Sequence, residues 1–169
     1  MNNQETERLW VNVEADERTM REIYFPAFQA VVQKAGAKSI MGSYNLIRGT
    51  HVCENKDIMG TVLRKEWGFN GFVYSDLSSI EGITGARVAQ NHKEASVLAL
   101  KAGVDMDLGG NAYGKNLRQA LKEKLIGMQD IDRAVANILR LKFRMGLFEN
   151  PYVSPELSLI HISEPTRPY

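Results

Sequence analysis

The sequence predicts an α/β fold in which short parallel strands alternate with helices. Apolar runs of strand length are followed by longer stretches in which apolar residues recur at helical spacing. These stretches end at Gly36, Gly68, Gly103 and Gly146, and glycine often follows the last turn of a helix. The order is typical of a parallel sheet covered by helices, either an open doubly wound sheet or a TIM-type (β/α) barrel. A closed barrel takes eight strands and roughly 250 residues, so a barrel formed by these 169 residues would be partial.

The first helix is expected from about residue 16 to residue 35, and the first strand over 38–44. Asp16 can cap this helix. Pro26 predicts a kink or a restarted turn inside it, because proline has no backbone N–H to donate. Residues 45–54 are expected to form a loop. The side of the helix that is expected to face inward carries Met20, Ile23, Tyr24, Ala27, Phe28, Val31 and Val32.

A second helix and strand follow the same order. Asn55 can cap a helix that runs to Gly68, and the next strand, 71–75, ends directly at Asp76. The segment from Leu77 to about residue 91 contains Gly and Ser and is expected to form a loop. The apolar side of this helix carries Ile58, Val62, Leu63 and Trp67.

The last part of the domain is expected to contain three helices and one strand. A helix over 92–102 precedes a third short strand at 104–108. Another helix contains Leu117 to Leu125, and Asp130 can cap a final helix. Apolar residues of the final helix that are expected to face inward are Ile131, Ala134, Val135, Ile138, Leu139 and Phe143.

We expect one domain over residues 1–153 and a different segment after it. Residues 154–169 contain three prolines without any period, which predicts a disordered tail. The end of this segment also resembles a translated sequencing-adapter read, so it could be an artefact. We therefore leave it out of the functional argument.

Composition excludes several classes of function. The formal net charge is +1, which argues against nucleic acid and anionic membranes as partners. No apolar run approaches the roughly 20 residues that span a bilayer. The single cysteine and three scattered histidines form no zinc spacing, so neither a metal nor a cofactor is predicted. The cellular compartment stays open.

One carboxylate stands where parallel α/β folds bind ligands, beyond the carboxyl ends of the strands. Asp76 follows the apolar strand 72–74 almost directly. An aspartate there can act as a nucleophile, a general base or a metal ligand. It can also simply cap the next turn, and position alone favours that reading.

Six segments, in this order along the chain, resemble family 3 glycoside hydrolases of the β-glucosidase type. The resemblance is to the second half of their amino-terminal barrel domain, over about residues 2–153. Any one segment is weak evidence, but six in the right order are specific. The segments are residues 2–8, 16–24, 41–45, 63–69, 72–76 and 103–108.

The resemblance implies a retaining glycosidase and assigns its nucleophile to Asp76. A second carboxylic acid then protonates the leaving oxygen and later activates water. Arg8, Met41 and Tyr44 match positions near the nucleophile or along the sugar-binding subsite. Arg8 would orient Asp76 and keep it ionised, the alternative being a surface arginine. Implied substrates are β-linked glucosides or short oligosaccharides.

Several other residues are expected to be structural. Asp105 and Asp107 should accept backbone N–H bonds, and Trp67 should pack in the core. Cys53 is expected to be a small buried residue, and His51 receives no role. Glu5 and Glu66 are also expected to be structural, and His92, like His51, receives no role.

The chain also departs from the family pattern. Leu77 stands where the family usually has tryptophan, and Gly42 where it often has a larger residue. Earlier barrel strands and a following sandwich domain, which supplies the acid/base glutamate in two-domain relatives, have no counterpart in the sequence. The resemblance therefore implies a fragment with little activity and, because apolar faces would be uncovered, poor solubility.

Three alternatives remain at this point. One is an inactive or carbohydrate-binding module that lacks the acid/base residue. Another is an unrelated open α/β domain, although no Gly-rich phosphate loop supports it. The third is the single-domain N-acetylglucosaminidase branch of the same family, which the segment 2–8 fits less well.

Overall fold

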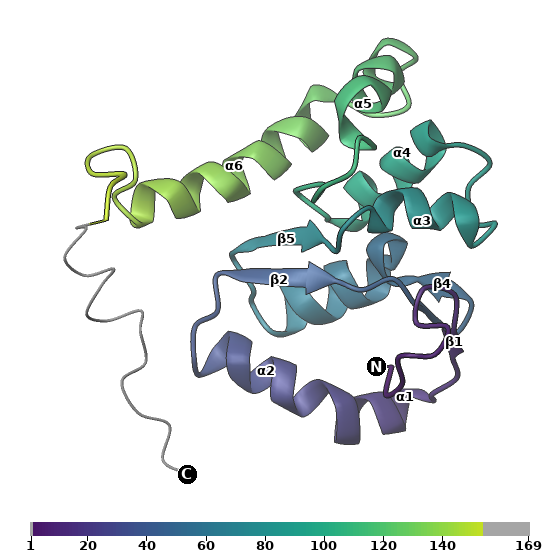
Figure 1. Ribbon diagram of the computed structural model, residues 1–169. Helices are drawn as coiled ribbons and strands as arrows, with labels where there is room; N and C mark the ends of the chain where they lie inside the picture. The colour runs from purple at the N-terminus through teal and green to yellow at the C-terminus, as the bar shows by residue number, and fades with distance from the viewer. Residues whose placement is uncertain (1, 154–169) are drawn as a thin grey trace.

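The computed structural model describes residues 2–153 (Figure 1). The predicted tail at 154–169 lies outside the described residues, so the boundary at 153 stays a prediction. The described residues form a mixed α/β fold with parallel strand pairs, as expected. None of their helices is long and apolar enough to cross a membrane.

The first helical stretch begins and restarts where the sequence predicts. The Asp16 Oδ1 atom accepts the Thr19 N–H at 2.6 Å, which caps the helix. A new helix starts at Phe25, with Pro26 in its first turn, where a missing N–H costs no helical hydrogen bond. The consecutive elements are β1 (Asn12–Val13), α1 (Glu17–Thr19), the π-helical η1 (Met20–Tyr24) and α2 (Phe25–Gln33).

The segment expected as a loop at 45–54 contains a small antiparallel hairpin. Arg48 and Gly49 form its turn, with φ of +51° and +78°. Both values suit a type I′ turn, for which arginine is an unusual first residue, so this turn could not be predicted from local residue types. The elements of this region are β2 (Ser39–Gly42), β3 (Leu46–Ile47), β4 (Thr50–His51), the 3₁₀ helix η2 (Val52–Glu54) and the π-helical η3 (Asp57–Glu66).

The loop predicted after Asp76 contains a helix, α3, which is a second correction. Its glycines and serine weaken helix propensity, but Ile80 and Ile83 are completely buried and stabilise it through packing. The final helix also starts earlier than predicted, because Asp130 accepts the Gly127 N–H at 2.9 Å from inside the first turn. The elements are β5 (Phe72–Ser75), α3 (Ser79–Gly85), α4 (His92–Ala102), α5 (Tyr113–Lys122) and α6 (Met128–Arg144).

The central sheet pairs β2 with β5 in parallel, from Ser39 opposite Phe72 to Gly42 opposite Ser75. The strand predicted at 104–108 is reduced to a single parallel bridge between Tyr74 and Met106. The Asp105 carboxylate accepts a hydrogen bond from the Val73 N–H at 2.9 Å, so a side chain takes the place of a backbone carbonyl as the partner of this strand residue. A second small sheet has the order β1-β3-β4.

The core lies on one side of the central sheet. Val73 and Ser75 are completely buried there, and Gly42 faces Cys53 and Met59. A separate apolar cluster joins α4 to α5 and α6 through Leu100, Ala120, Ile126 and Ala134. Trp67 packs edge-to-face on Phe25, with ring centroids 5.5 Å apart, as its predicted core role requires.

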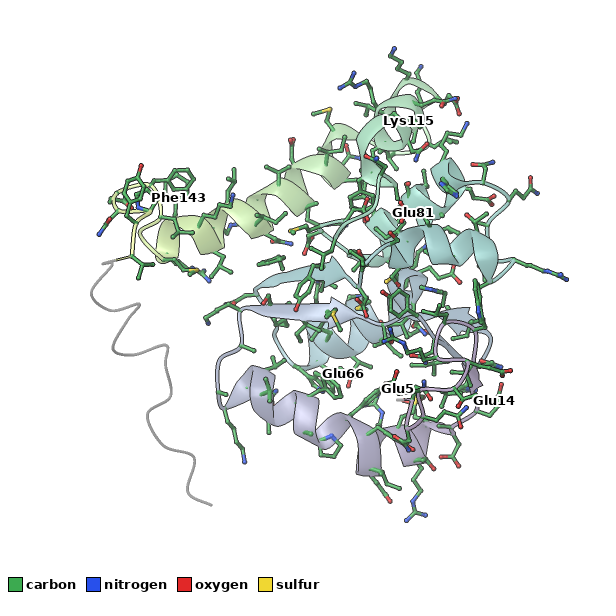
Figure 2. The ribbon with its side chains drawn as sticks, viewed as in Figure 1. Glu5, Glu14, Glu66, Glu81, Lys115 and Phe143 are labelled. Carbon is green, nitrogen blue, oxygen red and sulfur yellow. The ribbon has the colours of Figure 1, made fainter. Side chains whose placement is uncertain are left out.

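Two of the predicted helices expose apolar side chains that were expected to face inward, so this part of the prediction is wrong. On η1 and α2, Ile23 is 68% exposed, and Phe28 and Val31 are also exposed. On α6, which extends away from the central sheet in Figure 1, Ala134 is buried but Phe143 is exposed (Figure 2). No described element covers these faces, so helical spacing alone overestimated their burial. Val135 and Leu139 on α6 are exposed in the same way.

Candidate active site

Asp76 lies immediately after β5, at the carboxyl end of the central sheet. Its backbone N–H donates to the Gly42 carbonyl at 2.9 Å, which continues the pairing of β2 with β5 by one residue. Residues 73 and 75 point toward the helices, so alternation along the strand sends Tyr74 and Asp76 to the opposite side. The carboxylate therefore leaves the sheet on its open side.

The Asp76 carboxylate is fixed through one oxygen. Oδ1 accepts the Leu77 N–H at 2.7 Å, whereas Oδ2 accepts no hydrogen bond from the residues that the structure describes. The residue that precedes α3 is Ser78, in the left-handed region with φ of +55°, and its side chain makes no cap bond. Asp76 is thus not the N-cap of α3, and one oxygen stays available to a ligand.

The backbone around Asp76 is tied to the loop that follows Met106. Ser78 N–H donates to the Leu108 carbonyl at 3.0 Å, and Leu108 N–H donates to the Ser75 hydroxyl at 2.9 Å. These bonds connect the ends of two neighbouring segments directly beside the carboxylate. Ser75 belongs to the segment 72–76 and Leu108 to the segment 103–108 of the resemblance, but the bond between them could not be predicted from the sequence.

Tyr44 lies beside Asp76. Its hydroxyl donates to the Leu77 carbonyl at 2.8 Å. Burial first, and then the neighbouring Asp76 carboxylate, raise the pKa of the Tyr44 hydroxyl, so tyrosine keeps its proton. The site therefore holds a neutral hydrogen-bonding phenol next to the carboxylate.

Arg8 reaches the same site through Tyr44. Its guanidinium carbon is 5.5 Å from the centroid of the Tyr44 ring, a cation–π distance. Arg8 also pairs with Glu5 at 3.4 Å, and both side chains are exposed. Among the described residues it makes no direct ion pair with Asp76, so the Tyr44 ring connects the two.

Met41 lies farther back on the open side of the sheet. It is the β2 partner of Tyr74 in the parallel register and is 47% exposed. Phe72 and Tyr74 gather on this side, with ring centroids 5.9 Å apart. The open side thus presents an apolar and aromatic surface that leads to Asp76.

Asp105 and Asp107 accept backbone N–H bonds, from Val73 at 2.9 Å and from Tyr113 at 3.2 Å, as predicted. The Asp105 carboxylate also accepts hydrogen bonds from the Arg64 guanidinium at 2.6 Å and from the Asn137 side-chain amide at 3.0 Å. Burial raises the pKa of the Asp105 carboxyl, although the Val73 N–H and Arg64 each lower it. This network fixes β5 below Asp76, and sequence reasoning missed its arginine.

His51 has a larger structural role than the sequence indicated. It is almost completely buried, and its Nδ1 accepts the Cys53 N–H at 3.2 Å. Burial lowers the pKa of His51 to about 4, so the ring is neutral near pH 7. Cys53 is buried as predicted, and burial raises the pKa of its thiol to about 12.

The residues 2–153 contain no group of three or more His, Cys, Asp or Glu side chains that could hold a metal ion. The exposed Glu66 carboxylate forms a two-bond ion pair with Arg21 at 2.7 and 3.0 Å, which is the structural role expected for it. Asp76, Tyr44 and Arg8 are the polar side chains that lie together at the end of β5.

The known proteins that this chain resembles are named as glycosidases. A β-glucosidase from Rhizobium radiobacter is 36% identical over 159 residues, which cover 93% of this chain and 18% of that protein. A β-xylosidase from Formosa agariphila is 38% identical over 144 residues, which cover 79% of this chain and 20% of that protein. The alternative of a mere carbohydrate-binding module is not favoured by relatives that are named as enzymes.

The fold gives the same result. A crystal structure of β-glucosidase from Listeria innocua in complex with gluconolactone matches with a TM-score of 0.85 and 32% identity. The match covers 90% of this chain and 21% of that one. The model of the glycosyl hydrolase family 3 N-terminal domain matches residues 3–141, and the chain belongs to this family. It spans about a fifth of the length of the relatives that it matches.

Proposed function

We propose that this chain is part of the barrel domain of a retaining glycoside hydrolase of the β-glucosidase type, with Asp76 as the nucleophile. The proposed substrates are β-linked glucosides or short oligosaccharides. The observation that carries the proposal is the Asp76 carboxylate, which ends β5 on the open side of the sheet next to Tyr44 and keeps Oδ2 available.

In the proposed reaction, Asp76 attacks the anomeric carbon of the sugar. The bond from that carbon to the leaving oxygen breaks as the bond to the carboxylate forms, and a second carboxylic acid gives its proton to the leaving oxygen. Water then hydrolyses the glycosyl-enzyme, and the second residue takes up the proton of the water.

The neighbours of Asp76 support this role in different ways. The Leu77 N–H, at 2.7 Å, holds Oδ1 and so orients the carboxylate toward the open side. The protonated Tyr44 hydroxyl lies close enough to stabilise charge at Asp76 when the glycosyl-enzyme breaks down. Arg8 adds a positive charge above the Tyr44 ring, and Met41 supplies an apolar wall.

We propose that the rest of the sugar-binding site comes from parts of the relatives that this chain does not match. The chain spans about a fifth of their length, and one carboxylate cannot act as both nucleophile and acid. In retaining enzymes the two carboxyl groups lie about 5–5.5 Å apart. The isolated chain is therefore expected to have little or no hydrolytic activity, since acid–base assistance alone contributes about 10²–10⁴-fold.

A chimera with a complete relative tests the role of Asp76. Residues 3–141 of this chain would replace the matching segment of the Rhizobium radiobacter β-glucosidase. A 2-fluoroglycoside should then label Asp76 covalently, as mass spectrometry of peptides would show. Asp76→Asn should abolish both labelling and turnover of an aryl β-glucoside, whereas Asp132→Asn on the exposed side of α6 should leave both intact.

Two outcomes would refute the proposal. One is a label that stays on another carboxylate in the Asp76→Asn chimera. The other is rapid hydrolysis of an aryl β-glucoside by the purified 169-residue chain, because that would require an acid/base residue within it.

A further inference from the structure

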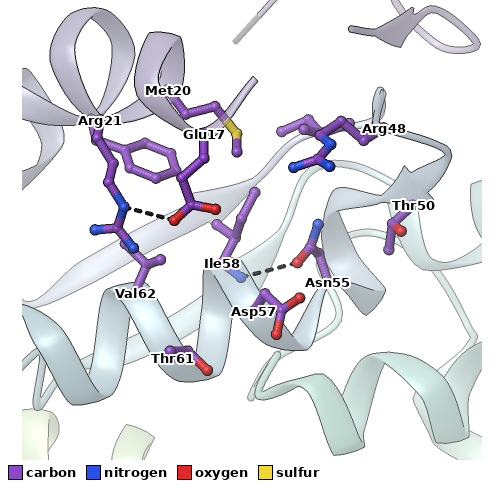
Figure 3. Close-up of a pocket in the computed structure, with 12 residues that line it drawn as sticks. Glu17, Met20, Arg21, Arg48, Thr50, Asn55, Asp57, Ile58, Thr61 and Val62 are labelled. Carbon is purple, nitrogen blue, oxygen red and sulfur yellow. Dashed lines mark hydrogen bonds and ion pairs between the residues drawn. The ribbon is translucent and has the colours of Figure 1, made fainter. Parts of the chain in front are cut away.

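A cavity lies away from Asp76, between α1, η1 and α2 on one side and η3 on the other (Figure 3). Its volume is about 380 Å³, within the range of small-molecule sites. None of Arg8, Met41, Tyr44 or Asp76 lines it. The site proposed above therefore does not account for this cavity.

One part of the cavity wall is apolar. Side chains from both helical stretches and from β3 contribute to it, and most of them belong to the main core. These side chains are Met20, Phe25, Ile47, Ile58 and Val62. Because they are fixed by core packing, they form a rigid apolar surface.

The other part of the wall offers hydrogen-bonding groups of both kinds. The Asn55 Oδ1 atom accepts the Ile58 N–H at 2.9 Å, which leaves its amide N–H groups free to donate to a ligand (Figure 3). Arg48 and Asp57 form no ion pair with the residues that the structure describes. Free donors and a free carboxylate therefore face the same space.

The charges around the cavity cancel. Glu17 binds Arg21 at 2.7 Å, and Arg48 and Asp57 add one charge of each sign. An anionic ligand would meet two carboxylates, and a cationic ligand two guanidinium groups. A purely apolar ligand would remove Arg48 and Asp57 from water without hydrogen bonds, which is unfavourable.

The backbone of Arg48 is itself held at a conformational cost. Its φ of +51° lies in the left-handed region at the tip of the β3–β4 hairpin, where glycine or asparagine is favoured. Figure 3 shows its guanidinium directed over the cavity, opposite Ile58 and Asn55. A residue that keeps an unfavourable backbone conformation is a reasonable place to look for a binding role.

We propose that this cavity is an accessory binding site for a neutral, polyhydroxylated ring, that is, one saccharide unit. The C–H face of the ring would pack on Phe25 and Ile58. Its hydroxyl groups would donate to Asp57 and accept from Arg48 and Asn55. The site is separate from Asp76 and does not depend on the catalytic role proposed for that residue.

Chemical-shift mapping of the ¹⁵N-labelled 169-residue chain tests the site. Titration with D-glucose and cellobiose should shift amide signals of residues 47–62. Arg48→Gly removes the guanidinium and relieves the left-handed backbone, so the variant should fold at least as well. Its affinity should fall about tenfold, the change expected for one charge-assisted hydrogen bond. Arg48→Asn, which also tolerates this conformation, should behave in the same way.

Matched controls separate this site from the catalytic proposal. Asp76→Asn and Lys65→Gln, the latter on the exposed side of η3, should keep the affinity of the wild-type chain. Glucuronate and glucosamine serve as charged probes and should not bind more tightly than glucose. The proposal is overturned if neutral sugars leave signals 47–62 unchanged, if Arg48→Gly binds glucose like the wild type, or if either charged probe is preferred tenfold.

Discussion

The two sides of the β2–β5 sheet differ sharply although they belong to the same strands. On the helix-covered side, Val73 and Ser75 are completely buried, and Gly42 lies against the side chains of Cys53 and Met59. On the open side, Met41 is half exposed and Asp76 keeps a free carboxylate oxygen. Neighbouring residues in one strand thus meet different constraints.

The covered side of the sheet contributes to stability, whereas the open side keeps polar groups available for a ligand. Buried polar groups on the covered side, such as Ser75 and Asp105, are held by hydrogen bonds within the protein. The polar groups of the open side, such as Asp76, keep bonding capacity for a ligand. Substitutions on the covered side should therefore change the free energy of unfolding, and those on the open side should change it little.

The largest effect is expected at the buried ion pair of Arg64 and Asp105. Asp105→Asn leaves the Arg64 guanidinium without its carboxylate, which should cost about 3–5 kcal/mol in the free energy of unfolding. Urea denaturation followed by circular dichroism measures it. The exposed pair of Arg21 and Glu66 is the control, and Glu66→Gln should cost much less, because solvent screens an exposed ion pair. Equal costs for the two changes would break the contrast.

The second effect depends on pH through His51. Its pKa falls from 6.5 to about 4 on folding, so the unfolded chain binds the proton more tightly. The neutral ring contributes about 3 kcal/mol to the free energy of unfolding above pH 6.5. This contribution is lost as pH falls from 6.5 through about 4. Asn keeps an acceptor near the Cys53 N–H without titrating, so His51→Asn should flatten this loss. His92→Asn, at an exposed position, should leave the pH profile unchanged.

A smaller effect is expected where Gly42 contacts the thiol. A Cβ atom at position 42 would lie 2.8 Å from Cys53 Sγ, so Gly42→Ala should cost about 1–3 kcal/mol through overpacking. Cys53→Ala should remove most of that cost in the double variant. A thermal melt of the two single variants and the double variant measures the coupling. If the costs of the two single changes simply added up in the double variant, the Cys53 thiol would not be what excludes a larger residue at position 42.

The smallest effect is expected on the open side. Met41→Thr retains a residue suited to strands and should change the free energy of unfolding by about 0.5 kcal/mol or less. Denaturation midpoints of this variant and of Val73→Thr, on the covered side, compare the two faces directly. A cost at Met41 that matches the cost at Val73 would show that the open side is packed in solution.

Much of the fold followed from local patterns in the sequence. Caps such as Asp16 and left-handed glycines such as Gly103 act within a few residues, so their effects can be predicted locally. The helix α3 was missed because burial of Ile80 and Ile83 outweighs weak propensity. The exposed faces of α2 and α6 were misjudged because periodicity shows which residues share a side, not what covers that side.

The candidate site was predictable only in part. The position of Asp76 at the carboxyl end of an apolar strand singled it out, whereas Arg8, Met41 and Tyr44 came from the family resemblance. Their roles remain proposals. Nothing local links Tyr44 to residues more than thirty positions later, so its bond to the Leu77 carbonyl required the structure. Arg64 was missed for the same reason, since its partner Asp105 is 41 positions away.

Leu77 connects to both neighbours of the site through its backbone alone. Its N–H holds Asp76 and its carbonyl holds the Tyr44 hydroxyl, while its side chain projects into solvent. Any residue except proline can supply the same two bonds. The side chain at position 77 can therefore be exchanged without loss of the backbone bonds that hold the carboxylate and the phenol.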